Sequence, residues 1–146
     1  SPIVNLHYKI EKTAPPLMET PFIGLTRGLA QWLFVRDDIA SVTISAADDV
    51  VDLPAEEIAG RVWRDVARAL GTPNDPQPSC RVIKERRATF RQSPDQVALR
   101  PATRTRIPNL LLAGDWTDTG VPATIEGAIR SGFAAADAAL AGSTRA

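Results

Sequence analysis

Apolar and polar positions alternate through much of the first third of the chain, which is the period of a half-buried β-strand. The alternation is clearest from Pro2 to Ile10 and again from Ile39 to Ala46. Two further apolar stretches, Phe22 to Leu25 and Leu29 to Arg36, also predict strands. A proline-containing loop is expected over Lys12 to Thr20. Because short connections join the later strands, we expect antiparallel pairing in a sheet of about four or five strands.

The period then changes to that of an amphipathic helix, which we expect over Asp52 to Leu70 with Asp52 or Leu53 as its cap. Pro54 lies in the expected first turn. Gly71 and Pro73 would end the helix. One apolar stripe runs along it at helical spacing: Ile58, Val62, Val66, Ala69 and Leu70.

A further strand is expected from Arg81 to Phe90, followed by a polar, irregular stretch from Ser93 to Pro108. The continuous apolar run Leu110 to Ala113 is typical of a strand buried on both faces. A terminal helix should follow, with small residues at Gly127, Ser131 and Gly132 that allow close approach. Its apolar stripe would comprise Ile125, Ala128, Ile129, Gly132, Phe133, Ala136 and Leu140.

Charge and composition exclude several classes of function. The chain has 146 residues with 17 basic and 17 acidic side chains, so nothing in its net charge favours nucleic acid as a partner. The single cysteine, Cys80, excludes an internal disulfide, and together with the single histidine it cannot form a zinc site of the usual kind. We therefore expect no resident metal. The apolar runs are too short to span a membrane, and no signal peptide is recognisable.

The densest candidate chemistry lies around a Gly114-Asp115 turn that follows the expected buried strand. An aspartate there could accept hydrogen bonds from ribose or ribityl hydroxyls, or could simply cap the turn. The following helix start, Ala123-Thr124-Ile125-Glu126, could hold a phosphate or stabilise negative charge on a bound ring. The alternative is an ordinary helix end capped by Thr124.

Other candidates favour plainer interpretations. His7 could be a general base, but a lone histidine on the polar side of a strand is usually a surface residue. The acidic pairs at Asp37, Asp48 and Glu56 lie at turns or a helix start, which indicates solvated residues. A solvated or salt-bridged strand also explains the basic set Arg81, Lys84, Arg86, Arg87 and Arg91. No residue is assigned as a catalytic acid or base.

The stretch from Asn109 to Thr117, together with Gly120 to Gly132, closely resembles the C-terminal flavin-binding motif of FAD-dependent amine oxidase and phytoene desaturase-like enzymes. Three weaker stretches resemble the squalene-associated branch of that family, the hydroxysqualene dehydroxylases: Ala30 to Phe34, Ile39 to Ala46 and Glu85 to Phe90. The resemblance covers nearly the whole chain.

The resemblance implies a role for each matching residue. Asp115 would hydrogen-bond the ribityl or phosphate part of FAD, and Gly114 would allow close approach. The backbone amides from Ala123 through Thr124 and Ile125 to Glu126 would face the N1/C2 edge of the flavin, where a reduced ring carries negative charge. The pyrophosphate-binding Gly-x-Gly-x-x-Gly unit of such enzymes is absent here, so we expect a C-terminal piece that is inactive and binds FAD poorly if at all.

The predicted fold is α+β. Residues 1–92 would form part of a substrate-binding domain, with a mixed or antiparallel sheet and a packed helix that wall an apolar tunnel. Residues 93–146 would supply the terminal strand and helix of an FAD-binding, Rossmann-like domain. Cut free, that strand could pair elsewhere, so a dimer of the isolated chain is a further expectation.

The resemblance implies a parent oxidoreductase that converts hydroxysqualene to squalene in bacterial hopanoid synthesis. Its FAD would be held by the full-length protein and its substrate would be an isoprenoid lipid. Such an enzyme would be cytoplasmic, with peripheral association with the membrane. Two alternatives stay open: a carotenoid or phytoene desaturase or amine oxidase of the same superfamily, and a self-contained, non-enzymatic α+β interaction module.

Overall fold

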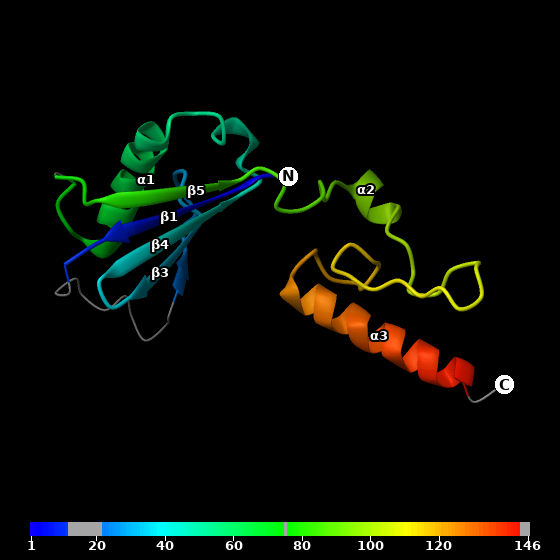
Figure 1. Ribbon diagram of the computed structural model, residues 1–146. Helices are drawn as coiled ribbons and strands as arrows, with labels where there is room; N and C mark the ends of the chain where they lie inside the picture. Colours follow the sequence, from blue (N-terminus) through cyan, green and yellow to red (C-terminus); the bar gives the residue numbers. More distant parts are fainter. Residues whose placement is uncertain (12–21, 75, 144–146) are drawn as a thin grey trace. The chain divides into compact units, whose positions relative to one another are not determined.

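The computed structural model describes residues 1–11, 22–74 and 76–143. The chain forms two compact units, which divide between Ala88 and Thr89, whereas the sequence places the boundary after residue 92. The loop expected over Lys12 to Thr20 lies outside the described residues. Each unit is considered by itself below (Figure 1).

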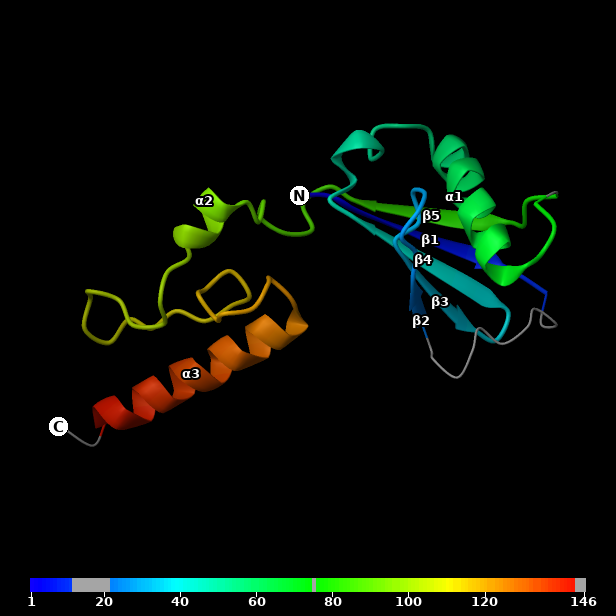
Figure 2. The same cartoon turned by 180° about the vertical axis from the view of Figure 1, so that it is seen from behind.

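The first unit is built on a five-stranded antiparallel sheet with the strand order β2-β3-β4-β1-β5. Figure 2 shows this order from behind, with β2 at one edge. The predicted antiparallel sheet is therefore confirmed, with β4 at its centre and β1 between β4 and the edge strand β5. The strands are β1 (Ile3–Lys9), β2 (Phe22–Gly24), β3 (Trp32–Arg36), β4 (Ile39–Ser45) and β5 (Cys80–Glu85).

Alternation along the strands separates two faces of this sheet. Val4, Leu6 and Tyr8 of β1 are fully buried, and Val42 and Ile44 of β4 lie beside them in the same core. The intervening residues face the other way, as the sequence pattern predicts. The second face holds polar side chains at its centre and exposed aromatic side chains toward β2.

Helix α1 (Ala55–Leu70) covers the apolar face of the sheet (Figure 1). The predicted stripe is confirmed, with four of its side chains buried and Ala69 partly buried: Ile58, Val62, Val66 and Leu70. Pro54 directly precedes the first turn, so neither Asp52 nor Leu53 is the cap. Gly71 ends the helix in the left-handed conformation at φ 67°. A 3-10 turn, η1 (Ala47–Asp49), precedes the helix and was not predicted.

The strand predicted from Arg81 to Phe90 is too long. β5 ends at Glu85, and residues 86–89 form a turn. Arg86 leaves the ladder to pair with Asp52, with Nη1 and Oδ1 2.5 Å apart, and Lys84 donates to the carbonyl of Leu53. The salt-bridged interpretation of the basic set is thus confirmed for Arg86.

The second unit contains a short helix, α2 (Pro94–Ala98), and the terminal helix α3 (Ile125–Ser143). α2 lies in the stretch expected to be irregular. The strand expected at Leu110 to Ala113 does not form: Leu111 makes one isolated bridge to Arg104, and Leu110 is 44% exposed. A strand buried on both faces needs neighbouring strands on each side, and the described part of this unit provides only that single bridge.

Helix α3 presents its predicted apolar stripe to solvent. Ile125, Phe133 and Leu140 are 82%, 69% and 69% exposed. The helix is instead buried along its small residues, Gly127 and Ser131, which confirms close approach at those two positions. An added Cβ at Gly127 would lie 3.0 Å from the Pro122 carbonyl oxygen, whereas Gly132 faces open space. Nothing in the described part of this unit covers the stripe.

Candidate functional site

The turn after Leu110 to Ala113 is anchored to helix α3. The Gly114 amide donates to Ser131 Oγ at 2.7 Å, and Ser131 Oγ donates to the Ala128 carbonyl at 2.7 Å. Ser131 is only 1% exposed. Gly114 has φ 147°, and an added Cβ there would lie 2.3 Å from Trp116 Nε1. The turn therefore requires glycine and is fixed against the second turn of α3.

Asp115 is half-buried in this turn, and its carboxylate accepts no hydrogen bond from the part of the chain that the structure describes. The turn is closed by Thr117 instead, whose amide and hydroxyl both donate to the Gly114 carbonyl at 3.1 and 2.8 Å. Capping is thus performed by Thr117. The Asp115 carboxylate remains able to accept hydrogen bonds from a ligand.

Arg100 holds the loop that joins this turn to α3, and sequence reasoning did not single it out. Its Nη2 donates to the Asp115 carbonyl at 2.9 Å and to Thr119 Oγ1 at 3.2 Å, and its Nη1 donates to the Val121 carbonyl at 2.7 Å. The guanidinium also lies over the Phe90 ring, with 5.8 Å between Cζ and the ring centroid. Such a fork of donors fixes several carbonyls at once.

The start of α3 is capped as the plainer interpretation predicts. Thr124 Oγ1 accepts from the Gly127 amide at 3.2 Å, and the Ala123 amide donates to Gln92 Oε1 at 2.9 Å. Two amides of the first turn, those of Ile125 and Glu126, have no acceptor among the described residues. The carboxylate of Glu126 is paired with Arg130 Nε at 2.6 Å. The helix end therefore combines an ordinary cap with two donors that could serve an acceptor on a ligand.

His7 lies elsewhere, in the first unit, on the face of the sheet opposite α1. Its Nδ1 is 2.9 Å from Ser41 Oγ across the β1–β4 pair. It is half-buried on the exposed face, as expected for the polar side of a strand, but its pairing with Ser41 was not predicted. The register needed to find this pair depends on strand order, which alternation does not give.

Two titratable groups are perturbed in the core of the first unit. Burial raises the pKa of the Tyr8 phenol, with the neighbouring Cys80 as the next cause, and the Tyr8 hydroxyl donates to the Ala59 carbonyl at 2.8 Å. Burial also raises the pKa of the Cys80 thiol. Both groups face α1 and serve the packing of the core.

A comparison with protein families decides the class of the chain. The family profile described as flavin containing amine oxidoreductase matches residues 36–140, which is most of the 146-residue chain. The chain belongs to this flavin-containing family. The match spans β4, α1, the Gly114 turn and nearly all of α3. Membership of this family implies FAD as the cofactor of the full-length protein.

The chain is also similar to three curated bacterial proteins that are named hydroxysqualene dehydroxylase. It is 48% identical over 138 residues to that of Sinorhizobium fredii, and 46% identical over 139 residues to that of Rhodopseudomonas palustris. It is 43% identical over 140 residues to that of Zymomonas mobilis. These matches cover 94 to 95% of this chain and 32% of each relative. The chain therefore spans about a third of the length of the relatives it matches.

The residues that the structure describes contain no cluster of three or more His, Cys, Asp or Glu side chains able to hold a metal ion. Among the same residues, no helix is both long and apolar enough to cross a membrane.

Proposed function

We propose that this chain supplies part of an FAD-dependent oxidoreductase that removes the hydroxyl of hydroxysqualene to give squalene for hopanoid synthesis. The observation that carries the proposal is the Asp115 carboxylate, which has no partner among the described residues and lies in a glycine turn anchored to α3. The names of the three relatives support the substrate, and the matched family supports the cofactor.

The residues present fit part of a flavin site. Asp115 offers carboxylate oxygens that match the hydroxyls of a ribityl chain. The amides of Ile125 and Glu126 offer donors at a helix start, which suits the electron-rich edge of the ring. When bound, FAD would supply the hydride chemistry that no side chain of this chain can supply. The chain's own contribution is to hold the cofactor and to stabilise charge without a titrating group.

The two units would have separate tasks in this proposal. Residues 93–146 would belong to the FAD-binding, Rossmann-like domain, and residues 1–92 would belong to the substrate-binding domain. The exposed apolar side chains of α3, Ile129 and Phe133 among them, would pack against the rest of the FAD-binding domain. In the same way, the exposed face of the sheet would wall the site of a long isoprenoid chain.

The test uses the full-length protein that carries this sequence. Purified protein is incubated with FAD, a reductant and hydroxysqualene, and the products are identified by mass spectrometry. Formation of squalene supports the proposal. Desaturation of phytoene-like substrates, or oxidation of amines, would assign the protein to another branch of the family. A protein that retains no flavin and turns over none of these substrates would favour an interaction module.

Asp115→Ala tests the cofactor site in the same protein, and Asp118→Ala is its control. Asp118 is the same residue type three positions along and is exposed. Loss of one hydrogen bond to a charged acceptor should weaken FAD retention by roughly 10- to 100-fold, because such a bond contributes about 1.5–3 kcal/mol. Equal flavin content in both variants would refute the role of Asp115. The 146-residue chain alone should retain little FAD.

A further inference from the structure

The exposed face of the first unit's sheet carries a row of residues that lie directly opposite one another. Phe34 on β3 pairs with Ser41 on β4, Ser41 pairs with His7 on β1, and His7 pairs with Arg81 on β5. Directly opposed residues of antiparallel strands place their side chains on the same face. The row therefore changes from aromatic to polar to charged as it crosses the sheet.

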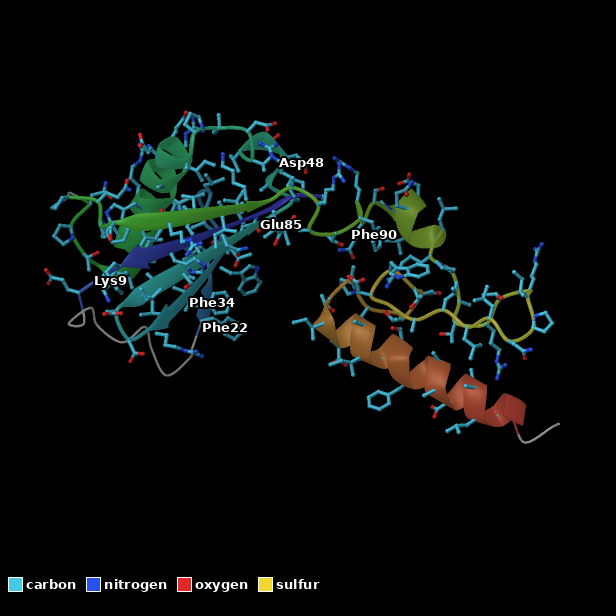
Figure 3. The ribbon with its side chains drawn as sticks, viewed as in Figure 1. Lys9, Phe22, Phe34, Asp48, Glu85 and Phe90 are labelled. Atoms are coloured by element: carbon cyan, nitrogen blue, oxygen red, sulfur yellow. The ribbon has the colours of Figure 1, made fainter. Side chains whose placement is uncertain are left out.

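Aromatic side chains gather at the β2–β3 edge of this face. The rings of Phe22 and Phe34, both labelled in Figure 3, have centroids 5.6 Å apart. The ring centroids of Phe22 and Trp32 are 6.0 Å apart. The three side chains are 40 to 46% exposed, so each leaves a large part of its ring uncovered. A cluster of uncovered aromatic rings suits an unsaturated hydrocarbon chain, which offers apolar surface and no hydrogen bonds.

Polar side chains begin one strand further in. His7 Nδ1 lies 2.9 Å from Ser41 Oγ, and Thr43 Oγ1 donates to Asn5 Oδ1 at 2.8 Å, so the side chains of His7 and Asn5 are each oriented by a partner on β4. The bond to Ser41 fixes the ring of His7, and its Nε2 has no hydrogen-bond partner among the described residues. Since strands are about 4.8 Å apart, His7 lies roughly 10 Å from Phe34.

We propose that His7, positioned by Ser41, binds the hydroxyl that leaves an isoprenoid alcohol and donates a proton to it. This inference rests on the proposed function, because removing a hydroxyl calls for an acid. Hydroxide is a poor leaving group, and a proton from a positioned side chain converts it to water. The hydrocarbon arms of the same substrate would lie toward Phe22, Trp32 and Phe34. One face thus matches a substrate that is a long apolar chain with a single polar group.

The bond between the substrate carbon and the hydroxyl oxygen breaks with its electron pair on oxygen, and the proton on Nε2 of protonated His7 moves to that oxygen to form water. A reduced flavin, the cofactor that the family implies, would supply the hydride for the new C–H bond, so the substrate carbon would gain two electrons and the reductant would lose two. The imidazole of His7 is left neutral and regains its proton from solvent.

Histidine is the appropriate acid among the described side chains on this part of the face. Asn5, Ser41 and Thr43 do not titrate near neutral pH. The charged groups nearest to His7 are Lys9 on its own strand and Arg81 opposite it on β5, and both are exposed and therefore screened by solvent. Lys9 is further paired with Asp38.

The experiment compares two substrates in the full-length protein: hydroxysqualene and its acetate ester, whose leaving group needs no proton. His7→Gln should lower kcat for the alcohol by about 100-fold or more, as expected for loss of a general acid. The acetate ester should be reduced by the variant at nearly the wild-type rate. Ser41→Ala removes the orienting hydrogen bond and should cost roughly tenfold on the alcohol alone.

Lys9→Gln is the matched control, because it removes a charge two residues away on the same face, and its kcat should equal that of wild type. Flavin content and circular dichroism establish that each variant is folded. If wild-type protein forms squalene and both His7→Gln and Ser41→Ala have the wild-type kcat for the alcohol, the role of His7 is overturned. The proposed function would then remain intact. Equal losses on alcohol and ester would also overturn the role of His7, because they would indicate a structural defect. A wild-type enzyme without dehydroxylase activity would overturn both.

Discussion

Asp65 provides a stringent test of how the first unit is held together. This helix residue is 8% exposed, and its Oδ2 accepts the amides of Leu29 at 2.7 Å and Ala30 at 3.2 Å. The two amides belong to the connection between β2 and β3, so Asp65 ties that connection to α1. Gly28 passes so close that an added Cβ would lie 2.2 Å from Oδ2. We predict that Asp65→Ala destabilises the first unit much more than the loss of an exposed ion pair does.

The magnitude follows from which donors lose their acceptor. Ala30 is fully buried, so its amide would remain without a partner, at a cost of about 1–3 kcal/mol. The Leu29 amide is only partly buried and can recover a bond to water, at roughly 1 kcal/mol. The expected loss is therefore about 2–4 kcal/mol of the free energy of unfolding. Asp65→Asn retains a neutral acceptor and should lose about half as much.

Urea unfolding of the 146-residue chain, followed by tryptophan fluorescence, measures this loss. Two variants serve as controls: Asp52→Ala, which breaks an exposed pair with Arg86, and Arg68→Ala, whose side chain is 66% exposed beside Asp65. Each should cost less than about 1 kcal/mol. Amide hydrogen exchange should accelerate first at Leu29 and Ala30. The reasoning fails if Asp65→Ala costs no more than Asp52→Ala, or if exchange rises evenly over the whole sheet.

Three further outcomes follow from the core and from α1. Tyr8 is the only tyrosine, and burial raises its pKa, so phenolate absorbance should appear only with unfolding. Because the unfolded state loses this proton near pH 10 while the folded state keeps it, the free energy of unfolding should fall as pH rises above about 10. Cys80, half-buried with a raised pKa, should react with a thiol reagent far more slowly before unfolding than after. In urea unfolding, Gly71→Ala should lower the free energy of unfolding by about 1–2 kcal/mol, because φ is 67° and an added methyl group would gain no contact in the open space around it. Gly60→Ala, within the helix, should leave this free energy unchanged or raise it.

Periodicity predicted the elements that bury one face against a nearby partner. β1, β4 and the apolar stripe of α1 were predicted because alternation and helical spacing record half-burial directly. The prediction of a strand at Leu110 to Ala113 was wrong, because a continuous apolar run indicates burial but does not indicate which segment covers it. Nothing in the described part of the chain pairs with it beyond one bridge.

The candidate site shows a second limit of sequence reasoning. The Gly114 turn and the Thr124 cap were predictable, since glycine and threonine have local reasons to occupy those positions. Arg100 had no such signal, because its three acceptors lie 15 to 21 residues further along the chain. His7 was similarly undervalued, because its pairing with Ser41 depends on strand order and register. A sequence pattern can predict turns and caps, which depend on neighbouring residues, but it does not predict contacts between residues far apart in the chain.

The two units differ in what holds them together, and this bears on the cofactor. The first unit has a continuous apolar core, but the described residues of the second bury only Thr117, Gly127 and Ser131. The turn at Gly114 therefore depends on polar anchors and on α3 staying in place. Four apolar side chains of α3 are exposed by 51 to 82%: Ile125, Ile129, Phe133 and Leu140.

Burying each of these side chains against a partner surface would contribute about 1.5–3 kcal/mol. A ligand that binds the turn without this packing must also supply the free energy of ordering the helix against it. In a protein of the relatives' length, we expect the surrounding domain to hold α3 against the turn before FAD binds. The hydrogen bonds of Asp115 would then contribute fully to the affinity for FAD. This coupling is the physical reason to expect strong FAD binding by the full-length protein and weak binding by the 146-residue chain.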